Sequence, residues 1–105
     1  MPADDDGPLT LCVLLWPRPG QDDALTAYED AVLALLPDHG ARLVSRVRRR
    51  ASDGPAAAGP LEVQIIELPS GEALAAYMAD PRRAALAVDR DAAIERTEIL
   101  DVVPR

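Results

Sequence analysis

The stretch LEVQIIELPSGEALAAYM, residues 61–78, changes its hydrophobic pattern partway along. Residues 61–68 alternate apolar and polar side chains, which is the period of a β-strand with two different faces. Leu74, Tyr77 and Met78 then recur at steps of three and four, the spacing of one helix face. The stretch therefore predicts a strand that leads through a short turn into a helix.

The helix after this strand has two start signals. Ser70 is a suitable N-cap, because its hydroxyl group can accept a hydrogen bond from a backbone N–H of the first turn. Asp80 and Pro81 supply a second start, with Asp80 as N-cap and Pro81 at the first helical position. We therefore expect a broken helix over about 71–94, whose alanine-rich second half has no clean apolar face.

Two strands and a helix precede this unit. LTLCVLLW (9–16) is a nearly continuous apolar run, typical of a strand that is buried on both faces. From Asp22 the apolar residues fall at steps of three and four, which predicts a helix over about 22–37, and Gly40 suits a left-handed C-terminal cap. ARLVSRVRRR (41–50) alternates again and predicts a half-exposed strand.

The order of elements defines the expected fold. Residues 96–103 form the last predicted strand, and residues 51–60 form a flexible connection rich in alanine, glycine and proline. A hairpin across this connection would set Arg46 and Arg48 against Glu62, as a favourable cross-strand charge pairing. The order β-α-β-β-α-β predicts a ferredoxin-like α+β fold, a four-stranded antiparallel sheet with two helices on one face.

Composition limits the classes of function. The 105 residues fit a single domain over 9–105, after a flexible acidic lead-in over residues 1–8. A net charge of −7 disfavours nucleic acid and anionic membranes as partners. The N-terminus lacks the apolar run of a signal peptide or membrane anchor, so we expect a cytoplasmic protein. One histidine and the single Cys12 provide no metal-ligand spacing, and no nucleotide motif is present, so we expect neither metal nor cofactor.

Three stretches carry a resemblance to a known family: YEDAVLALLPDHGARLV (28–44), VQIIELPSGEALAAYMADPRRAAL (63–86) and R-x-A-A (90–93). Through them the chain resembles the DUF1330 family of small dimeric α/β-barrel proteins, relatives of antibiotic-biosynthesis monooxygenases and polyketide cyclases. The resemblance spans residues 9–103. It implies a homodimer in which two sheets meet face to face, which would cover the sheet face that the helices leave bare.

The same resemblance points to candidate positions. In that family an acidic residue, an aromatic residue and then Pro-Ser usually end the third strand. Glu67 matches the acidic residue, whereas Leu68 stands in place of the aromatic one. Family members often carry an Arg where this chain has Arg90, and an aromatic pair where it has Tyr77 and Met78.

Glu67 is the first catalytic candidate. Alternation puts Val63, Ile65 and Glu67 on one face of the strand, and we expect this face to lie under the helices. A carboxyl group buried there would have a raised pKa and could act as a general acid or base, or it would pair with Arg90 and anchor a ligand. The alternative is a strand-end acid that reaches water.

His39, the only histidine, is the second catalytic candidate, and its alternative role is to interact with the end of the helix before Gly40. Trp16, at the end of the first strand, and Tyr28 and Tyr77, on the two helical stripes, are candidates to bind the apolar body of a substrate. Their alternative role is to fill the margin of the core.

Two functional hypotheses follow. The first is a cofactor-independent enzyme of oxygenase, isomerase or cyclase type that acts on a small aromatic or polyketide-like metabolite in secondary metabolism. Its pocket would bind the apolar body through the aromatic residues, while Glu67, Arg90 or His39 moves a proton or fixes a polar group. The second is a non-catalytic dimer that binds a small molecule, in which those polar groups are structural.

Overall fold

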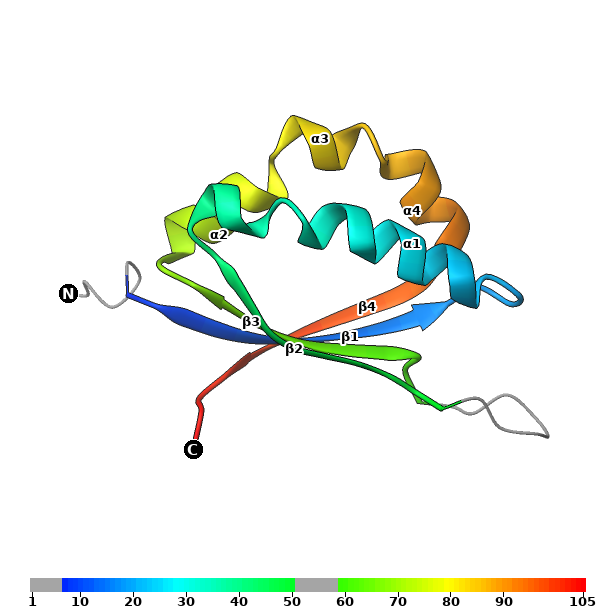
Figure 1. The fold of residues 1–105 in the computed structure, drawn as a ribbon, viewed down its shortest axis with the longest axis horizontal. Helices are drawn as coiled ribbons and strands as arrows, with labels where there is room; N and C mark the ends of the chain where they lie inside the picture. The colour runs from blue at the N-terminus through cyan, green and yellow to red at the C-terminus, as the bar shows by residue number, and fades with distance from the viewer. Residues whose placement is uncertain (1–6, 51–58) are drawn as a thin grey trace.

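The computed structural model describes residues 7–50 and 59–105. The elements run β1 (Leu9–Pro17), α1 (Asp22–Leu33), the 3-10 helix η2 (Leu36–His39), β2 (Arg42–Arg48), β3 (Glu62–Leu68), α2 (Gly71–Met78), α3 (Pro81–Ala84), α4 (Ala87–Ala93) and β4 (Ile94–Val102). The four strands pair antiparallel in the order β2-β3-β1-β4, and the helices lie on one face of this sheet (Figure 1). The predicted ferredoxin-like α+β fold is confirmed.

The predicted flexible segments over 1–8 and 51–60 lie largely outside the described residues. Within the described part of the chain, no helix is long and apolar enough to cross a membrane.

The central strand β1 carries the core. Leu11, Val13 and Leu15 point under the helices and are buried, whereas Cys12 and Leu14 alternate with them onto the other face. Because β1 pairs with β3 on one side and β4 on the other, its apolar run is enclosed along both edges. The prediction of a central strand from its continuous apolar run agrees with this arrangement.

The first helix ends earlier than predicted. The α-helix stops at Leu33, and the chain continues as η2 up to Gly40. Pro37 explains the early end, because its ring would clash with the carbonyl group four residues before it, at Leu33, and it has no N–H to donate. Gly40 adopts a left-handed conformation with φ of 70°, as the sequence predicts.

The second helical region consists of the three pieces α2, α3 and α4. Ser70 caps α2, because its hydroxyl oxygen accepts a hydrogen bond from the Ala73 N–H at 3.0 Å. Asp80 caps α3 through the Arg82 N–H at 2.8 Å, with Pro81 at the first position. Both predicted caps are confirmed. The piece before β4 ends at Ala93, so the last strand begins two residues before its predicted start at 96.

The face of β3 was assigned wrongly from the sequence. The residues under the helices are Glu62, Gln64, Ile66 and Leu68, all buried, while Val63, Ile65 and Glu67 lie on the opposite face. Two polar side chains thus occupy positions beside the core, where each finds a hydrogen-bond partner. Alternation identifies the two faces of a strand but not which of them is covered, and the polar pair made the wrong face look more suitable.

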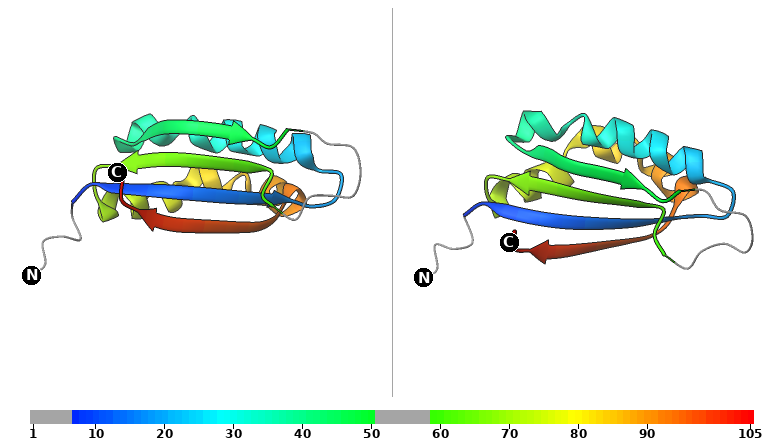
Figure 2. Two further views of the ribbon diagram at one scale, coloured as in Figure 1. Left: turned by 90° about the horizontal axis from the view of Figure 1, so that it is seen from below. Right: turned by 60° about the horizontal axis from the view of Figure 1, so that its bottom comes forward.

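The face of the sheet away from the helices is apolar over its central part, with the ion pairs Arg42–Glu67 and Arg96–Glu98 toward its ends. Its residues include Cys12, Leu14 and Trp16 on β1, Val47 on β2, Val63 and Ile65 on β3, and Leu100 and Val102 on β4. We call this set the open face. Figure 2 shows the sheet from this side, with no helix in front of it. Val47 is 55% exposed and Leu100 is 45% exposed, so within one chain this surface remains in contact with water.

Candidate functional site

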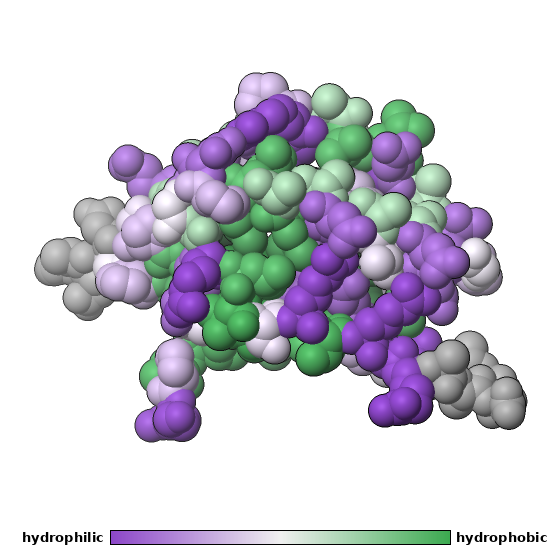
Figure 3. Space-filling view, viewed as in Figure 1, coloured by the Kyte–Doolittle hydropathy of each residue, from purple (hydrophilic) through white to green (hydrophobic). Residues whose placement is uncertain are grey.

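A cavity of about 370 Å³ lies between the sheet and the helices. Its wall is largely apolar, built from side chains of β1, β3, β4 and α2. In Figure 3 hydrophobic side chains gather between the helix layer and the sheet, with hydrophilic ones around them. Seven polar residues also line the cavity: Tyr28, Glu29, Gln64, Tyr77, Arg83, Arg90 and Thr97. Its size and composition are those of a site for a small organic molecule.

Glu29 is the buried acid of this cavity. It lies on α1, is only 5% exposed, and its Oε1 accepts a hydrogen bond from Nε2 of Gln64 at 2.8 Å. Burial raises the pKa of the Glu29 carboxyl above its ordinary value, and the negative charge of nearby Glu62 adds to the rise. Glu29 therefore keeps its proton to a higher pH than a surface glutamate does.

Glu29 belongs to a network of hydrogen bonds that connects α1 with β2 and β3. Nε2 of Gln64 also donates to Glu62 at 2.6 Å, so one amide group bridges the two acids. Nε of Arg46 donates to Glu62 at 2.7 Å, and its Nη1 donates to Asp30 at 2.6 Å. The predicted cross-strand pairing of Arg46 with Glu62 is confirmed, and it supplies the charge that a buried carboxylate requires.

Arg48, the other arginine predicted to face Glu62, has different partners. It occupies the register position opposite Glu62, but its guanidinium group donates to Thr26 and Asp23 on α1 at 2.9 and 3.2 Å. The Glu62 side chain points under the helices, where it accepts hydrogen bonds from Arg46 and Gln64.

Two tyrosines and an arginine form the helix side of the cavity. The Tyr77 hydroxyl donates to the carbonyl of Val32 at 3.0 Å, and burial raises the pKa of Tyr77 to about 12. Burial also raises the pKa of Tyr28, whose hydroxyl has no hydrogen-bond partner among the residues described. The guanidinium carbon of Arg83 lies 4.6 Å from the centre of the Tyr77 ring, which is a cation–π contact. A ligand here would meet an aromatic wall, a hydroxyl group and a positive charge.

Three of the six predicted site residues line this cavity, namely Tyr28, Tyr77 and Arg90. Trp16 and Glu67 lie on the opposite side of the sheet. The Trp16 ring lies under the guanidinium group of Arg96, whose carbon is 4.3 Å from the ring centre. The structure thus brings the two tyrosines together, but Trp16 is not with them.

Glu67 lies at the end of β3 and is not a buried acid. Its side chain is 42% exposed and forms an ion pair with Arg42 across the strand pair. It lines a separate shallow hollow near Gly40 and Pro69, away from the cavity under the helices. Its position agrees with the alternative reading, a strand-end acid that reaches water. Its pairing with Arg90 is not observed, because Arg90 lies on the helix side of the sheet, where it pairs with Asp91 at 3.6 Å.

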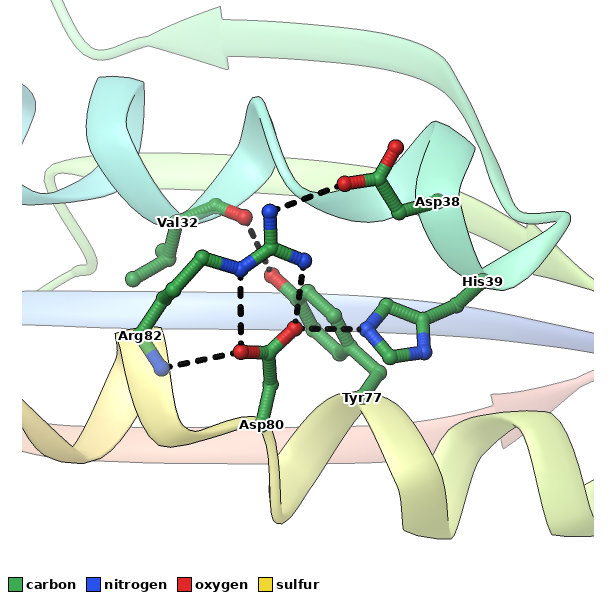
Figure 4. Close-up of polar contacts among 6 residues, drawn as sticks. All are labelled: Val32, Asp38, His39, Tyr77, Asp80 and Arg82. Carbon is green, nitrogen blue, oxygen red and sulfur yellow. Dashed lines mark hydrogen bonds and ion pairs between the residues drawn. The ribbon is translucent and has the colours of Figure 1, made fainter.

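His39 lies behind the cavity, at the contact between η2 and the start of α3 (Figure 4). Its Nε2 is 2.8 Å from Oδ2 of Asp80, and its ring meets the edge of Tyr77 with 5.7 Å between ring centres. Because a carboxylate can only accept, Nε2 must carry the proton of this bond. The ring therefore joins two elements and does not cap the helix that precedes it.

Asp80 is the centre of this second cluster. Arg82 donates to it from both the backbone and the guanidinium group, and the same guanidinium group reaches Asp38 on η2 at 2.9 Å (Figure 4). The hydrogen bonds from Arg82, and then the one from His39, hold the pKa of the Asp80 carboxyl well below its usual range. The cluster connects η2 with the junction of α2 and α3. Its His39 ring packs against the Tyr77 ring on the side away from the cavity.

Three residues of the cavity were missed in the sequence: Glu29, Gln64 and Arg83. A signal for Glu29 was present, because it lies four residues after Leu25 and three before Val32, on the same helix face. Gln64 was placed on the wrong face of its strand together with Glu62. Arg83 belongs to the alanine-rich half of the second helix, where no apolar stripe shows the orientation.

In the described segments, no group of three or more His, Cys, Asp or Glu side chains is arranged to hold a metal ion.

Comparison with known proteins yields structural matches only. No family model and no curated protein matches the chain. A protein of unknown function from Rhodopseudomonas palustris has a TM-score of 0.75 at 23% identity, over 95% of this chain and 84% of that one. A dimeric protein of unknown function with a ferredoxin-like fold from Bacteroides fragilis has a TM-score of 0.67 at 15% identity, over 91% of this chain and 95% of that one.

A third match is a DABB family protein with a ferredoxin-like fold from Mesorhizobium loti. Its TM-score is 0.63 at 17% identity, over 94% of this chain and 98% of that one. Identities this low establish the class of fold and nothing finer. The chain is therefore a ferredoxin-like α+β protein with a ligand-sized cavity beneath its helices, and its membership of DUF1330 stays a prediction.

Proposed function

We propose that this protein is a homodimer that binds a small, largely apolar organic molecule in the cavity between sheet and helices. The observation that carries the proposal is the cavity itself, with an apolar wall on which a few polar groups converge. Tyr28 and Tyr77 would contact the body of the ligand, and Glu29 would meet one of its oxygen atoms. Arg90 at the surface would contact whatever part of the ligand reaches the entrance.

The proposal extends to catalysis through Glu29. A carboxyl group with a raised pKa keeps its proton to a higher pH than an ordinary carboxyl group, and it can give that proton to a substrate and take it back, which is general acid–base chemistry. Isomerisation and cyclisation of aromatic or polyketide-like metabolites require such proton transfers. We infer a cytoplasmic enzyme of this type, active without a cofactor in secondary metabolism, with Glu29 in the catalytic role first considered for Glu67 and His39.

The dimer follows from the open face. A soluble single chain rarely leaves an apolar sheet surface of this kind in water. The Bacteroides fragilis protein with the same fold is described as dimeric, which supports a second copy as the cover. The helices would then lie outside the two sheets, and each chain would keep its own cavity.

Native mass spectrometry of the freshly purified protein tests the binding proposal. We expect twice the chain mass, plus a small additional mass that disappears on denaturation. That mass identifies a ligand whose conversion can then be assayed. A protein at the bare mass of a single chain would contradict both the dimer and the ligand site.

The Glu29→Gln variant separates the enzyme from the non-catalytic alternative. Glutamine can accept the same hydrogen bond from Gln64 but cannot transfer a proton. If Glu29 is catalytic, the variant still binds the retained molecule, while its turnover falls by about 100-fold or more. Glu67→Gln, on the other side of the sheet, is the matched control and should retain full turnover. Binding without any turnover in the wild-type protein would establish the non-catalytic alternative.

A further inference from the structure

Arg83 occupies an unusual position for an arginine in this chain. It projects from α3 to the wall of the cavity, is partly buried, and lies over the Tyr77 ring. Among the described residues, no carboxylate lies within ion-pairing distance of it. A partly buried guanidinium group gives up part of its hydration, and an anionic partner is the usual compensation.

Two other arginines of the chain do have a buried carboxylate as partner. Arg82, the preceding residue, binds the buried Asp80 at 2.8 Å. Arg46 binds the buried Glu62 at 2.7 Å. In a chain with 18 acidic residues and a net charge of −7, these two arginines each bind a buried carboxylate, whereas no carboxylate among the described residues pairs with Arg83. The position that a carboxylate would occupy opposite Arg83 is the cavity.

The positive charge of Arg83 affects the pKa values of three groups that line the cavity. Burial raises the pKa of Tyr28, Glu29 and Tyr77, and the positive charge of Arg83 opposes that rise at all three. The raised pKa values favour the neutral forms of the two tyrosines and of Glu29, and Glu29 is the only carboxylic acid among the described residues that line the cavity. Arg90, the other cation at its edge, is exposed and only loosely paired with Asp91, at 3.6 Å. Two arginines, Arg83 and Arg90, thus lie on the helix side of the cavity in an otherwise acidic protein.

We propose that the ligand of this cavity is an apolar carboxylic acid whose carboxylate binds Arg83. This inference rests on the proposed function and names its ligand class. A planar guanidinium group matches a carboxylate with two parallel hydrogen bonds. One partly buried arginine balances a single negative charge, so a monoanion fits better than a phosphate ester. The apolar body then lies along Val13 and Ile66 on the sheet, and a neutral oxygen of the ligand lies toward Glu29 and Tyr28.

The test compares naphthalene-2-carboxylate with its neutral amide, naphthalene-2-carboxamide, by isothermal titration calorimetry at pH 7.5 and low salt. The two probes have nearly the same shape and differ in charge. We expect the wild-type protein to bind the carboxylate about tenfold more tightly than the amide. In Arg83→Gln this preference should disappear, while affinity for the amide stays within about twofold.

Two further variants complete the experiment. Arg105→Gln removes one positive charge at the exposed C-terminal end and should keep the full preference. Arg83→Lys keeps the charge without the planar fork and should keep part of it, which guards against a folding defect in the glutamine variant. An undiminished preference in folded Arg83→Gln would overturn the anion site and leave the ligand cavity standing. Binding of neither probe by the wild-type protein at millimolar concentration would overturn the proposed function as well.

Discussion

Glu29 is a buried acid whose surroundings disfavour its charged form. The residue is 5% exposed, and its one hydrogen-bond donor among the described residues, the amide group of Gln64, is shared with Glu62. The donor is neutral, so ionisation of Glu29 would place two negative charges on one amide group. This arrangement favours a protonated acid, the state in which Glu29 can donate to a ligand.

The Glu29→Gln variant should show this directly in the pH dependence of stability. Because the folded pKa of Glu29 is raised above 4.5, the unfolded chain releases this proton first as the pH rises. Wild-type stability therefore falls from about pH 4.5 up to the folded pKa, and the variant lacks this loss. We expect the melting temperature of the variant to exceed that of the wild type by a few degrees at pH 8, with the gap closing at pH 4. A gap that does not change with pH would contradict the assignment.

Tyr77 and Tyr28 form a second residue-level comparison. The Tyr77 hydroxyl donates to the Val32 carbonyl, so Tyr77→Phe should lower the free energy of unfolding by about 1 kcal/mol. The Tyr28 hydroxyl has no such bond to any described residue, and Tyr28→Phe should change stability by less than about 0.5 kcal/mol. Urea unfolding of both variants at pH 7 measures the difference. Equal losses would show that the Tyr77 hydrogen bond does not contribute to stability.

At the scale of the elements, the junction between α2 and α3 is stabilised by one charged N-cap residue, Asp80. Asp80 accepts from the Arg82 backbone, from the Arg82 guanidinium group and from His39, which joins η2 to the helices above the cavity. In Asp80→Asn the backbone cap can persist, but the charge is lost. The variant tests whether the ion pairs or the cap hold the junction.

We expect Asp80→Asn to be less stable than the wild type at pH 7. The folded pKa of Asp80 is depressed below its ordinary value of 3.8, so the stability that it contributes is present above that value and is lost as the pH falls through the folded pKa. The gap between variant and wild type should therefore narrow below about pH 4. Thermal unfolding at pH 7, 4 and 3 measures it.

Ser70→Ala is the matched control for Asp80→Asn. It removes an uncharged cap at the start of α2 and should cost about 1 kcal/mol at every pH. If Asp80→Asn showed the same constant cost, the ion pairs with Arg82 and His39 would contribute nothing beyond the cap.

The success of the sequence prediction differs between elements for physical reasons. Caps are local, so Ser70 and Asp80 could be recognised from neighbouring residues alone. The covered face of β3 depends on which side the helices pack against, and that information is not in the strand. Gln64 illustrates the problem, because it is polar and yet buried through a bond to Glu29, a residue 35 positions away. The site was missed in part because it is built from such distant contacts.

At the scale of the whole molecule, the fold explains why a chain of 105 residues can hold a cavity at all. The four strands form the floor, and α1 and the broken second helical region form the roof (Figure 1). Tyr28 and Glu29 come from α1, Tyr77 from α2, Arg83 from α3 and Arg90 from α4. Every roof helix therefore contributes at least one polar side chain to the cavity. The ferredoxin-like order of elements was predictable from periodicity, and it placed the two tyrosines correctly.

A charge placed on the open face should prevent dimer formation. Ile65 lies on β3, a central strand of that face, and Ile65→Glu would bury a carboxylate between two sheets. We expect the variant to elute as a monomer at micromolar concentration in size-exclusion chromatography with light scattering. Val88→Glu, on the outer surface of α4 where Val88 is 80% exposed, should remain dimeric. A dimeric Ile65→Glu protein would place the interface elsewhere.

The most direct test of the ligand site uses the adjacent residues Ile65 and Ile66, which lie on opposite faces of the sheet. In methyl-labelled protein saturated with naphthalene-2-carboxylate, nuclear Overhauser effects report which methyl groups touch the ligand. We predict contacts from the ligand to Ile66, Val13 and Leu74, and none to Ile65. Contacts to Ile65 without Ile66 would place the ligand on the open face and contradict the cavity as the functional site.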